Sequence, residues 1–401
     1  MTQHSLAGPQ VLSLPRVFRP QRALPSDTVR PTRAEVNLGH LRHNLHCVRQ
    51  LAGARPVWAV LKADGYGHGA KAAARTLERA GAAGMCVALV EEGIELRQAG
   101  IKIPILVMGC HFGRAFGEVI AHRLTPVLHD PGQVEAFAEE VRYQGLEPID
   151  VHVKIDTGMS RLGVMPRELP RLARAFQQFP EARLFGLMTH FACADDSDLT
   201  HMEQQCARFD ESARYLTEQG LRPVVRHAAN SAAVFAGQKY QYDMVRPGIS
   251  LFGLSPDKGT DAGLLPVMRV RTEIVALREI ARGQSVGYGA TWSAARPSRI
   301  ATIPVGYADG LSRGLSNRGH VLVQGRRAPI VGVVSMDMTM IDVTDLPSVA
   351  MGDECVVLGS QKGPLGADEI SATEIAEMLG TIPWEVLTSI SRRVPRFYRE
   401  P

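Results

Sequence analysis

The feature that most constrains this chain is an alternation of short β-branched runs with amphipathic stretches. Eight such runs occur, at residues 57–62, 85–90, 103–108, 124–128, 150–156, 184–190, 224–228 and 243–247. Near-continuous apolar strands separated by helices are typical of a parallel sheet. Eight units in about 200 residues predict a closed (β/α)8 barrel of the TIM type. An open doubly wound sheet is the alternative.

The pattern changes after a break rich in Pro, Asp and Gly at residues 255–263. Residues 267–358 alternate in the manner of strands, with turn residues between them. The sequence therefore predicts an α/β barrel followed by a second, mostly antiparallel β domain. We expect an N-terminal arm over residues 1–32, a barrel over residues 33–264 and a C-terminal β domain over residues 265–401.

The net charge of +4 belongs to the N-terminal arm, because residues 1–33 contain five arginines and one aspartate and the rest of the chain is balanced. A nucleic-acid-binding protein would carry clustered Lys and Arg on its folded part. The six cysteines are widely spaced, which indicates buried thiols in a reducing compartment. No apolar stretch is long enough for a membrane span or a secretory signal. We therefore expect a cytoplasmic protein with no nucleic-acid or membrane partner.

Lys62 closes the first apolar run, in the segment Val-Leu-Lys-Ala-Asp-Gly-Tyr-Gly-His-Gly. One interpretation is a lysine that extends along the rim to solvent. The other is a desolvated amine with a lowered pKa, suited to proton transfer or to a Schiff base.

The same loop contains a match to the dinucleotide fingerprint, at Gly65, Gly67 and Ala70. Glu91 follows the second strand, where an acid that binds ribose would lie. However, Lys62-Ala-Asp separates the strand from the first glycine, and a Tyr and a His fill the turn. These departures argue against a nucleotide site.

Further polar residues stand at the ends of later strands, where barrel enzymes have their active sites. They are Lys154, Arg161, His190, Asn230, Ser231, Arg246 and Gly248. The loops after the last two strands of a barrel often bind phosphate, and a hydroxyl at Ser231 with close-approaching backbone at Gly248 fits that use. A phosphate subsite together with a poised lysine indicates pyridoxal 5'-phosphate.

Together these segments resemble the alanine racemase family of fold-type III pyridoxal phosphate enzymes. The matches run in the family's order from about residue 33 to 396. Besides the Lys62 segment they are Lys-Ile-Asp-Thr-Gly-Met-Ser-Arg-Leu-Gly, Thr-His-Phe-Ala, Ala-Asn-Ser-Ala, Val-Arg-Pro-Gly-Ile, Gly-Tyr-Gly-Ala-Thr-Trp, Val-Gly-Tyr-Ala-Asp-Gly and Ser-Met-Asp. The resemblance implies a two-base interconversion of L-alanine and D-alanine that supplies D-alanine for peptidoglycan.

The resemblance also implies roles for single residues. Lys62 would bind the cofactor covalently and act as a base on one face of the substrate α-carbon. Tyr288 would be the base on the opposite face, supplied by the other subunit of a homodimer. Arg246 would meet the pyridine nitrogen, and His190 would pack beside the ring and bond Arg246.

The remaining implied roles concern binding. The cofactor, and its phosphate in particular, would be held by Tyr66, Asn230, Ser231, Gly248 and Ile249. Arg161, oriented by Lys154, would contact the phenolic oxygen of the cofactor near the substrate. The backbone N–H of Met336 would bind the substrate carboxylate, with Asp337 beside it. No metal is expected.

Three positions depart from the better-known members of the family. Trp384 stands where a tyrosine is common, Val333 where an arginine is common, and Ser335 where a cysteine is common. These changes leave the proposed proton-transfer pair in place and bear on the strictness of the preference for alanine. The alternatives are a broad-specificity racemase of the same fold, a related decarboxylase and a non-catalytic cofactor-binding protein. Arg246 argues against the decarboxylase, which would carry an acid there.

Overall fold

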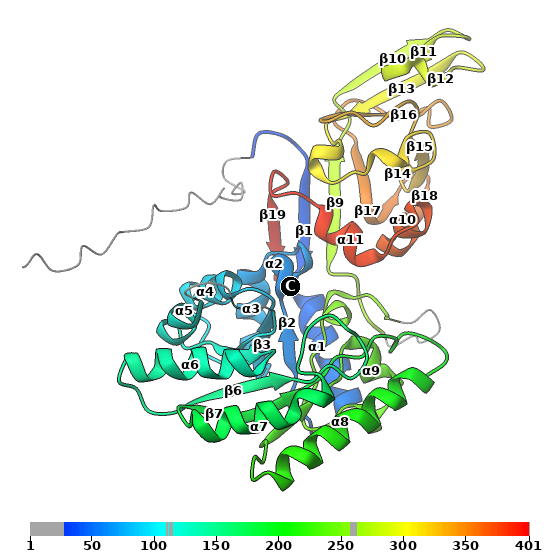
Figure 1. Cartoon of the computed structure of the whole chain (residues 1–401). Helices are drawn as coiled ribbons and strands as arrows, with labels where there is room; N and C mark the ends of the chain where they lie inside the picture. The colour runs from blue at the N-terminus through cyan, green and yellow to red at the C-terminus, as the bar shows by residue number, and fades with distance from the viewer. Residues whose placement is uncertain (1–27, 110, 112–114, 257–262, 401) are drawn as a thin grey trace, which may run out of the picture.

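The computed structural model describes residues 28–109, 111, 115–256 and 263–400. A parallel sheet with helices around it forms the lower part in Figure 1, and a part built mostly of strands lies above it. Residues 1–27, most of the predicted arm, lie outside the described residues. Among the helices of the described ranges, none is both long and apolar enough to cross a membrane.

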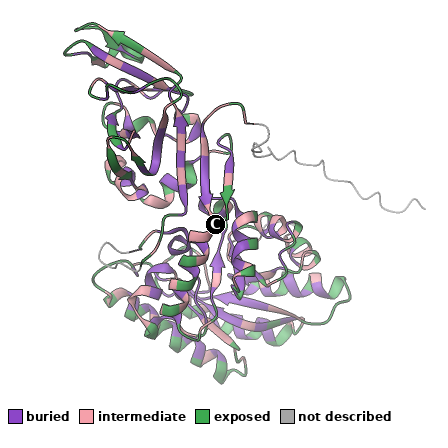
Figure 2. Ribbon diagram, turned by 180° about the vertical axis from the view of Figure 1, so that it is seen from behind, coloured by how far each residue is buried: buried purple, intermediate pink, exposed green. Residues whose placement is uncertain are grey.

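Seven parallel strands form the lower sheet and pair in chain order. They are β2 (Trp58–Val60), β3 (Gly84–Val87), β4 (Ile105–Val107), β5 (Thr125–Leu128), β6 (Ile149–Lys154), β7 (Ala182–Met188) and β8 (Val225–His227). Every residue of β3 and β4 is buried. A parallel sheet covered by helices buries apolar side chains on both faces, and Figure 2 shows these strands as the buried interior of the lower part.

The eighth predicted run, residues 243–247, closes the sheet without forming a regular strand. The N–H of Val60 in β2 donates to the carbonyl of Pro247 at 2.9 Å. On the other side, the N–H of Arg246 donates to the carbonyl of Ala229, just after β8, at 2.9 Å. Pro247 has no N–H to extend the ladder. The segment therefore joins the two edges of the sheet, so the predicted barrel is confirmed and the open doubly wound alternative is wrong.

Helices follow most of the strands and cover the barrel. They are α1 (Leu38–Ala52), α2 (Lys62–Tyr66), α3 (Ala70–Arg79), α4 (Val90–Gln98), α5 (Ala115–Ala121), α6 (Pro131–Tyr143), α7 (Leu169–Gln178), α8 (Thr200–Glu218) and α9 (Ser231–Ala236). Caps fix where several begin: the side chain of Asn37 accepts from the N–H of His40 at 3.1 Å and starts α1.

The C-terminal part is mostly antiparallel, as predicted. Its strands are β9 (Met268–Glu273), β10 (Ala276–Ile280), β11 (Ser285–Val286), β12 (Trp292–Ser293), β13 (Ser298–Ile303), β14 (His320–Val323), β15 (Arg326–Pro329), β16 (Thr339–Asp342), β17 (Glu354–Gly363), β18 (Gly366–Ile370) and β19 (Arg396–Arg399). Two helices, α10 (Ala372–Leu379) and α11 (Pro383–Ser389), complete it. In β9 buried and half-buried residues alternate, which is the period of a strand with one face on a core.

The strand β1 (Arg33–Asn37) lies before the barrel in the chain but pairs with the C-terminal part. Ala34 is opposite Val270 of β9 in an antiparallel pair and opposite Arg396 of β19 in a parallel pair. The predicted barrel begins at residue 33, whereas β1 pairs with β9 and β19 of the C-terminal part. The boundary between residues 264 and 265 stays a prediction.

We expect the substitution Phe137→Ala to lower the free energy of unfolding by about 3–5 kcal/mol, because it removes a fully buried ring of α6 and leaves a cavity. Urea denaturation followed by circular dichroism measures the change. Tyr143→Ala is the matched control, since that ring lies on the same helix and is 87% exposed. We expect it to change the free energy by at most about 0.5 kcal/mol. Equal effects of the two substitutions would contradict the core described here.

Candidate active site

The predicted barrel residues lie where the parallel strands end. Lys62 follows β2, Arg161 lies in the loop after β6, and His190 follows β7. Ser231 follows β8, and Arg246 belongs to the closing segment. The carboxyl ends of parallel strands meet at one mouth of a barrel. In Figure 1 this mouth, marked by α2, faces the C-terminal part.

The backbone after Lys62 turns in the left-handed sense over four residues. The φ angles of Ala63, Asp64, Gly65 and Tyr66 are 53°, 56°, 62° and 52°. This conformation costs an L-residue other than glycine roughly 1–2 kcal/mol, and such strain persists only where surrounding structure holds it. The turn is therefore a place where the chain accepts strain beside a predicted functional group.

Contacts from three directions hold this turn. The carboxylate of Glu92 accepts from the N–H of Ala63 at 2.6 Å, and that of Asp64 accepts from the N–H of Ala70 at 2.7 Å. The buried guanidinium of Arg396, from β19, donates from Nε and Nη2 to the carbonyl of Gly67 at 3.0 and 2.8 Å. The C-terminal part thus contacts the loop that carries Lys62.

Gly67, one of the fingerprint glycines, is required by packing rather than by a nucleotide. Its φ is +80°, and a Cβ there would lie 2.3 Å from the carbonyl oxygen of Leu387 in α11. Protein backbone therefore occupies the space that the fingerprint would leave for pyrophosphate. The dinucleotide interpretation of this loop has no support in the structure.

The amine of Lys62 has a lowered pKa. Desolvation at the mouth is the larger cause, and the positive charge of Arg161 adds to it. The carboxylate of Glu92 acts in the opposite direction. A lysine with a lowered pKa has a larger unprotonated fraction near neutral pH, which a nucleophile or a base requires.

Arg246 is buried and is oriented by a chain of two histidines. Its Nη1 donates to Nδ1 of His227 at 2.6 Å, and Nε2 of His227 lies 2.8 Å from Nδ1 of His152. Because arginine only donates, Nδ1 of His227 accepts, and the proton of His227 lies on Nε2. Nη2 of Arg246 donates to the carbonyls of Thr189 and Ala228.

The partner of Arg246 differs from the one implied by the resemblance. In the described parts of the chain its ring partner is His227 and not His190. The two histidines end neighbouring strands, so the motifs alone did not decide between them. His227 lies in the predicted run 224–228, and the resemblance implies no role for it.

Four basic groups act on His190. Burial is the main cause of its strongly lowered pKa, and Arg246, Lys154, Arg161 and Lys62 lower it further. A neutral imidazole surrounded by cations marks a mouth with positive potential. Such a site attracts anionic groups, for example phosphate, phenolate or carboxylate.

Ser231 and Gly248 lie together at the mouth. The hydroxyl oxygen of Ser231 accepts from the N–H of Gly248 at 2.9 Å and from the hydroxyl of Ser250 at 3.1 Å. A Cβ on Gly248 would lie 2.2 Å from the hydroxyl oxygen of Tyr66. Only glycine fits at position 248. Tyr66, Ser231 and the backbone that leads to Ile249 therefore lie close together.

The predicted residue Asn230, and Asp156 beside the predicted Lys154, have structural contacts of a different kind. The side chain of Asn230 caps α9 by accepting from the N–H of Ala233 at 3.0 Å. The carboxylate of Asp156, two residues after Lys154, accepts from the N–H groups of residues 158, 159 and 160. It fixes the loop that leads to Arg161.

Tyr288, Met336 and Asp337 lie in the C-terminal part. Tyr288 begins the short helix η5 (Tyr288–Ala290) between β11 and β12 and is 74% exposed. Figure 1 places β11 and β12 at the end of the C-terminal part farthest from the barrel. Within one chain, therefore, the structure does not bring Tyr288 to Lys62.

A charged network supports the loop of Met336 and Asp337. Asp309, which is fully buried, pairs with Arg30 at 2.7 Å and with Arg393 at 3.1 Å. Arg393 also pairs with Asp337 at 2.7 Å. Arg30 lies in the predicted arm. No sequence pattern predicts this network, because its members are far apart in the chain.

The three departures from the family pattern have definite environments. Trp384 is half-buried in α11 and packs against the main core. The hydroxyl of Ser335 donates to the carbonyl of Met338 at 2.7 Å and accepts from its N–H at 3.1 Å, which closes the loop around Met336. Val333 is half-buried.

The chain matches two family descriptions. "Alanine racemase, N-terminal domain" matches residues 36–256, and "Alanine racemase, C-terminal domain" matches residues 267–398. The chain belongs to the alanine racemase family. The resemblance found in its motifs is thereby confirmed.

Full-length relatives carry the same family name. A protein named alanine racemase from Sorangium cellulosum (strain So ce56) is 58% identical over 93% of this chain and 100% of its own length. A second, from Halothermothrix orenii, is 42% identical over 92% of this chain and 97% of its own.

Solved structures of family members have the same fold. The alanine racemase of Streptomyces coelicolor A3(2) is 35% identical, with a TM-score of 0.87 over 93% of this chain and 99% of that chain. The alanine racemase of Bacillus anthracis with bound L-Ala-P is 33% identical, with a TM-score of 0.86 over 93% and 96%.

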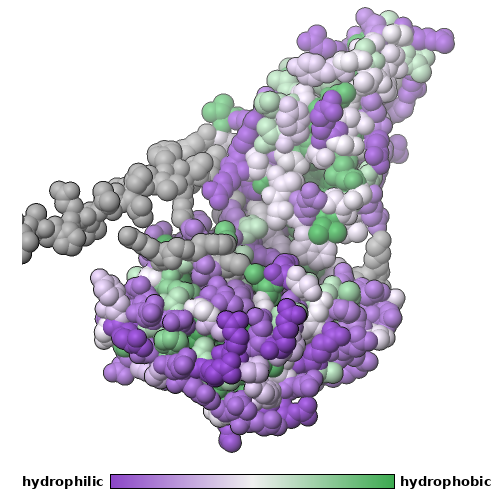
Figure 3. All heavy atoms as spheres, in the orientation of Figure 1, coloured by the Kyte–Doolittle hydropathy of each residue, from purple (hydrophilic) through white to green (hydrophobic). Residues whose placement is uncertain are grey.

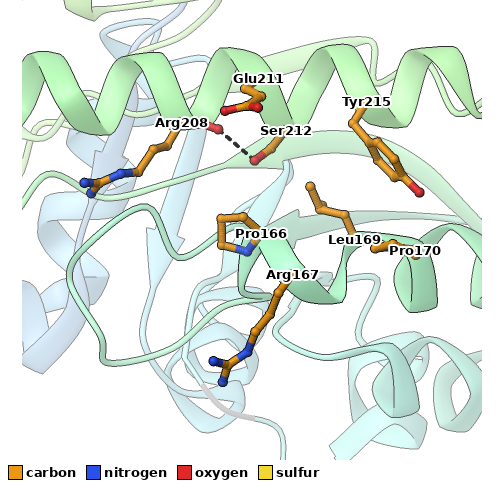
Figure 4. Close-up of a pocket in the computed structure, with 8 residues that line it drawn as sticks. All are labelled: Pro166, Arg167, Leu169, Pro170, Arg208, Glu211, Ser212 and Tyr215. Atoms are coloured by element: carbon orange, nitrogen blue, oxygen red, sulfur yellow. Dashed lines mark hydrogen bonds between the residues drawn. The ribbon is translucent and has the colours of Figure 1, made fainter.

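A cavity of about 270 Å³ lies apart from the barrel mouth residues, between α7, α8 and the short helix η2 (Pro166–Glu168). Figure 4 shows Arg167, Arg208 and Tyr215 around it, with the hydroxyl of Ser212 bonded within α8. None of the predicted site residues lines it. We assign it no part in the chemistry of the mouth.

The buried pair His152 and His227 predicts a loss of stability in acid. Burial lowers the pKa of His152 to about 4 and that of His227 well below its ordinary value. Between these values and about 6.5, the unfolded chain binds protons that the folded chain excludes. The free energy of unfolding therefore falls as the pH drops from 7 toward 4, by about 1.4 kcal/mol per pH unit for each such histidine.

Urea denaturation at pH 7, 6 and 5 measures this slope. His152→Gln removes one of the two titrating groups, and we expect its slope to be smaller than that of the unsubstituted protein. His46→Gln, at an exposed position of α1, is the control and should keep the original slope. An unchanged slope in His152→Gln would disprove the linkage.

Proposed function

We propose that this chain is an alanine racemase that interconverts L-alanine and D-alanine with pyridoxal 5'-phosphate. One observation carries the proposal: a lysine of lowered pKa lies at the mouth of a barrel where further cations surround a neutral histidine, in a chain of this family. The names of its full-length relatives support the substrate.

The residues at the mouth fit this cofactor. Lys62 offers an amine, Arg161 and Arg246 offer guanidinium groups, and Ser231 offers a hydroxyl beside the backbone of Gly248. When bound, the cofactor supplies an aldehyde that reacts with amines and an electron sink that acidifies the α-proton of an amino acid. Without such a sink, side-chain bases could not remove that proton at useful rates.

Lys62 holds the cofactor and moves one proton. Its lowered pKa gives the amine a larger unprotonated fraction, and covalent attachment would use the unprotonated form. With the cofactor bound, the amine of Lys62 would take or return a proton on one face of the substrate α-carbon. A positioned acid or base of this kind contributes about 10²–10⁴-fold to a rate.

Arg246 tunes the electron sink by keeping its own protons. Burial lowers the pKa of its guanidinium to about 10, which leaves it charged near neutral pH. It would therefore offer a hydrogen bond but no proton to the ring nitrogen of a bound cofactor. This would limit the electron withdrawal and disfavour side reactions such as transamination.

Tyr66, Ser231, Gly248 and Ile249 bind the phosphate in this proposal. The hydroxyl oxygen of Ser231 already accepts from three other groups, so its own hydrogen serves as a donor. Burial raises the pKa of Tyr66, so its phenol stays protonated and donates as well. Neutral donors and backbone N–H groups would bind the phosphate. The nearby cations would contact the other substituents of the cofactor.

Tyr288 is the base on the opposite face, supplied by the second subunit of a homodimer. A racemase with two bases needs one on each face of the α-carbon, and Tyr288 is distant from Lys62 within one chain. The C-terminal part also exposes Tyr288, Tyr307, Met336 and Met338. Figure 3 shows hydrophobic residues exposed on this part of the molecule. A twofold contact that covers such residues would complete two sites at once.

The cytoplasmic location and the supply of D-alanine for peptidoglycan belong to the same proposal. The described cysteines, Cys47, Cys86, Cys193, Cys206 and Cys355, are all free thiols. Free thiols throughout a chain are typical of a reducing compartment.

The purified protein is expected to convert L-alanine to D-alanine and, in D₂O, to replace the α-proton by deuterium. Lys62→Ala should lower both by roughly 10²–10⁴-fold or more and should abolish the absorbance of bound cofactor. Chiral chromatography with mass spectrometry measures both products, and the same assay on other amino acids measures the substrate range. Racemisation retained in Lys62→Ala would refute the assignment of Lys62, and release of CO₂ would favour the decarboxylase.

Mixing two inactive variants tests the shared site. A dimer of Lys62→Ala with Tyr288→Phe contains one site with both native bases, so unfolding and refolding an equal mixture should restore about one quarter of the original activity. Each variant refolded alone is the control and should stay inactive. No recovery in mixed dimers, verified by mass spectrometry of the intact assemblies, would show that both bases come from one chain.

Gly248→Ala is expected to weaken binding of pyridoxal phosphate by roughly tenfold, because the new methyl group would collide with Tyr66 and displace the phosphate ligands. Titration of the cofactor-free protein, followed by absorbance, measures the dissociation constant. Gly117→Ala is the control, since a Cβ there meets its nearest atom at 3.4 Å. Equal affinities of the two variants would argue against the phosphate site.

A further inference from the structure

Glu92 links two strand ends at the barrel mouth. It is the third residue of α4, which follows β3, and its Oε2 accepts from the N–H groups of Ala88 and Leu89 at 2.8 and 3.1 Å. Its Oε1 accepts from the N–H of Ala63 at 2.6 Å. One carboxylate therefore satisfies backbone donors of the loops after β2 and after β3.

Ala63 is the first left-handed residue after Lys62. A left-handed turn in an L-chain relaxes unless groups outside it hold its ends. Arg396 binds the carbonyl of Gly67 at the far end, and Glu92 binds the N–H of Ala63 at the near end. The near end is the one that sets the direction of the Lys62 side chain.

We propose that Glu92 is a positioning residue for Lys62, because its carboxylate fixes the start of the strained turn and places a negative charge beside the amine. The proposal rests on the role of Lys62 in the proposed function. No sequence motif identifies Glu92, and the acid in the dinucleotide interpretation is its neighbour Glu91, which is exposed.

The charge of Glu92 acts on a group that is otherwise surrounded by cations. Desolvation and Arg161 lower the pKa of Lys62, and Glu92 raises it. His190 also faces the amine and is neutral at ordinary pH. Glu92 therefore offsets the positive charge around this amine.

Helix capping alone does not explain Glu92. Glu168 has the same position in the short helix η2, where its Oε2 accepts from the N–H of Met165 at 3.1 Å. Glu168 also forms an ion pair with Arg171, one turn along the chain, at 3.8 Å. Glu168 thus caps its own helix, whereas Glu92 also reaches a second loop, and the two residues form a matched pair for a test.

The test measures the protonation of Lys62 directly. The full-length protein is freed of carbonyl cofactors with hydroxylamine and labelled with acetic anhydride at pH 6 to 11. Mass spectrometry of peptides gives the acetylation of Lys62, with the exposed Lys102 as an internal reference. The variants are Glu92→Gln, Glu92→Asp and Glu168→Gln, each checked by circular dichroism.

We expect Glu92→Gln to move the midpoint of Lys62 labelling to lower pH by about half a unit or more, because the neutral amide no longer stabilises the ammonium form. Glu92→Asp, which keeps the charge, should leave the midpoint close to that of the unsubstituted protein. If Glu92→Gln does not fold, a midpoint in Glu92→Asp that falls by about half a unit or more would overturn the role of the charge. Glu168→Gln should leave the midpoint unchanged. The pH profile of racemisation should shift in the same direction in Glu92→Gln.

Two results would overturn the proposal: an unchanged midpoint in Glu92→Gln, or an equal shift in Glu168→Gln. Neither measurement requires racemase activity. If the unsubstituted protein fails to racemise alanine, the proposed function fails while the labelling result still decides the role of Glu92.

Discussion

The closure of the parallel sheet by residues 243–247 is the constraint on which the rest of the site depends. This segment bonds to β2 on one side and to the end of β8 on the other. It carries Arg246 into the interior and Gly248 against Tyr66. Without these bonds the sheet would have two free edges, and the ends of β2 and β8 would not face each other. The mouth is therefore a consequence of closure, and its chemistry follows from which residues stand at the strand ends.

At this mouth the histidines near the buried cation Arg246 are neutral. Arg246 is a buried cation, and its partners are an imidazole and two carbonyls rather than a carboxylate. His227 accepts from Arg246 because its own proton is directed to His152. A carboxylate in place of His227 would neutralise the guanidinium and weaken the positive potential that an anionic ligand requires. The arrangement leaves the charge of Arg246 available and supplies hydrogen bonds in place of an ion pair.

Sequence patterns predicted the parts that depend on local periodicity. Apolar runs located the strands, and the principle that barrel sites lie at strand ends located Lys62, Arg161, His190 and Ser231. What they missed depends on contacts between distant segments. The choice of His227 as the partner of Arg246, the choice of Glu92 over Glu91, and the pairing of β1 with β9 and β19 are decided by packing in three dimensions. Periodicity gives the face on which a side chain lies but not the neighbour that it meets.

The left-handed turn after Lys62 explains why the C-terminal part matters to the barrel within one chain. Arg396 of β19 donates to the carbonyl of Gly67, and Leu387 of α11 packs so closely that only glycine fits at that position. A barrel without this part would lose both contacts at the far end of the turn. Glu92 would then hold the near end alone, and the left-handed residues would relax toward ordinary angles. The C-terminal part therefore supports the lysine of its own barrel, in addition to any side chain that it presents to a second subunit.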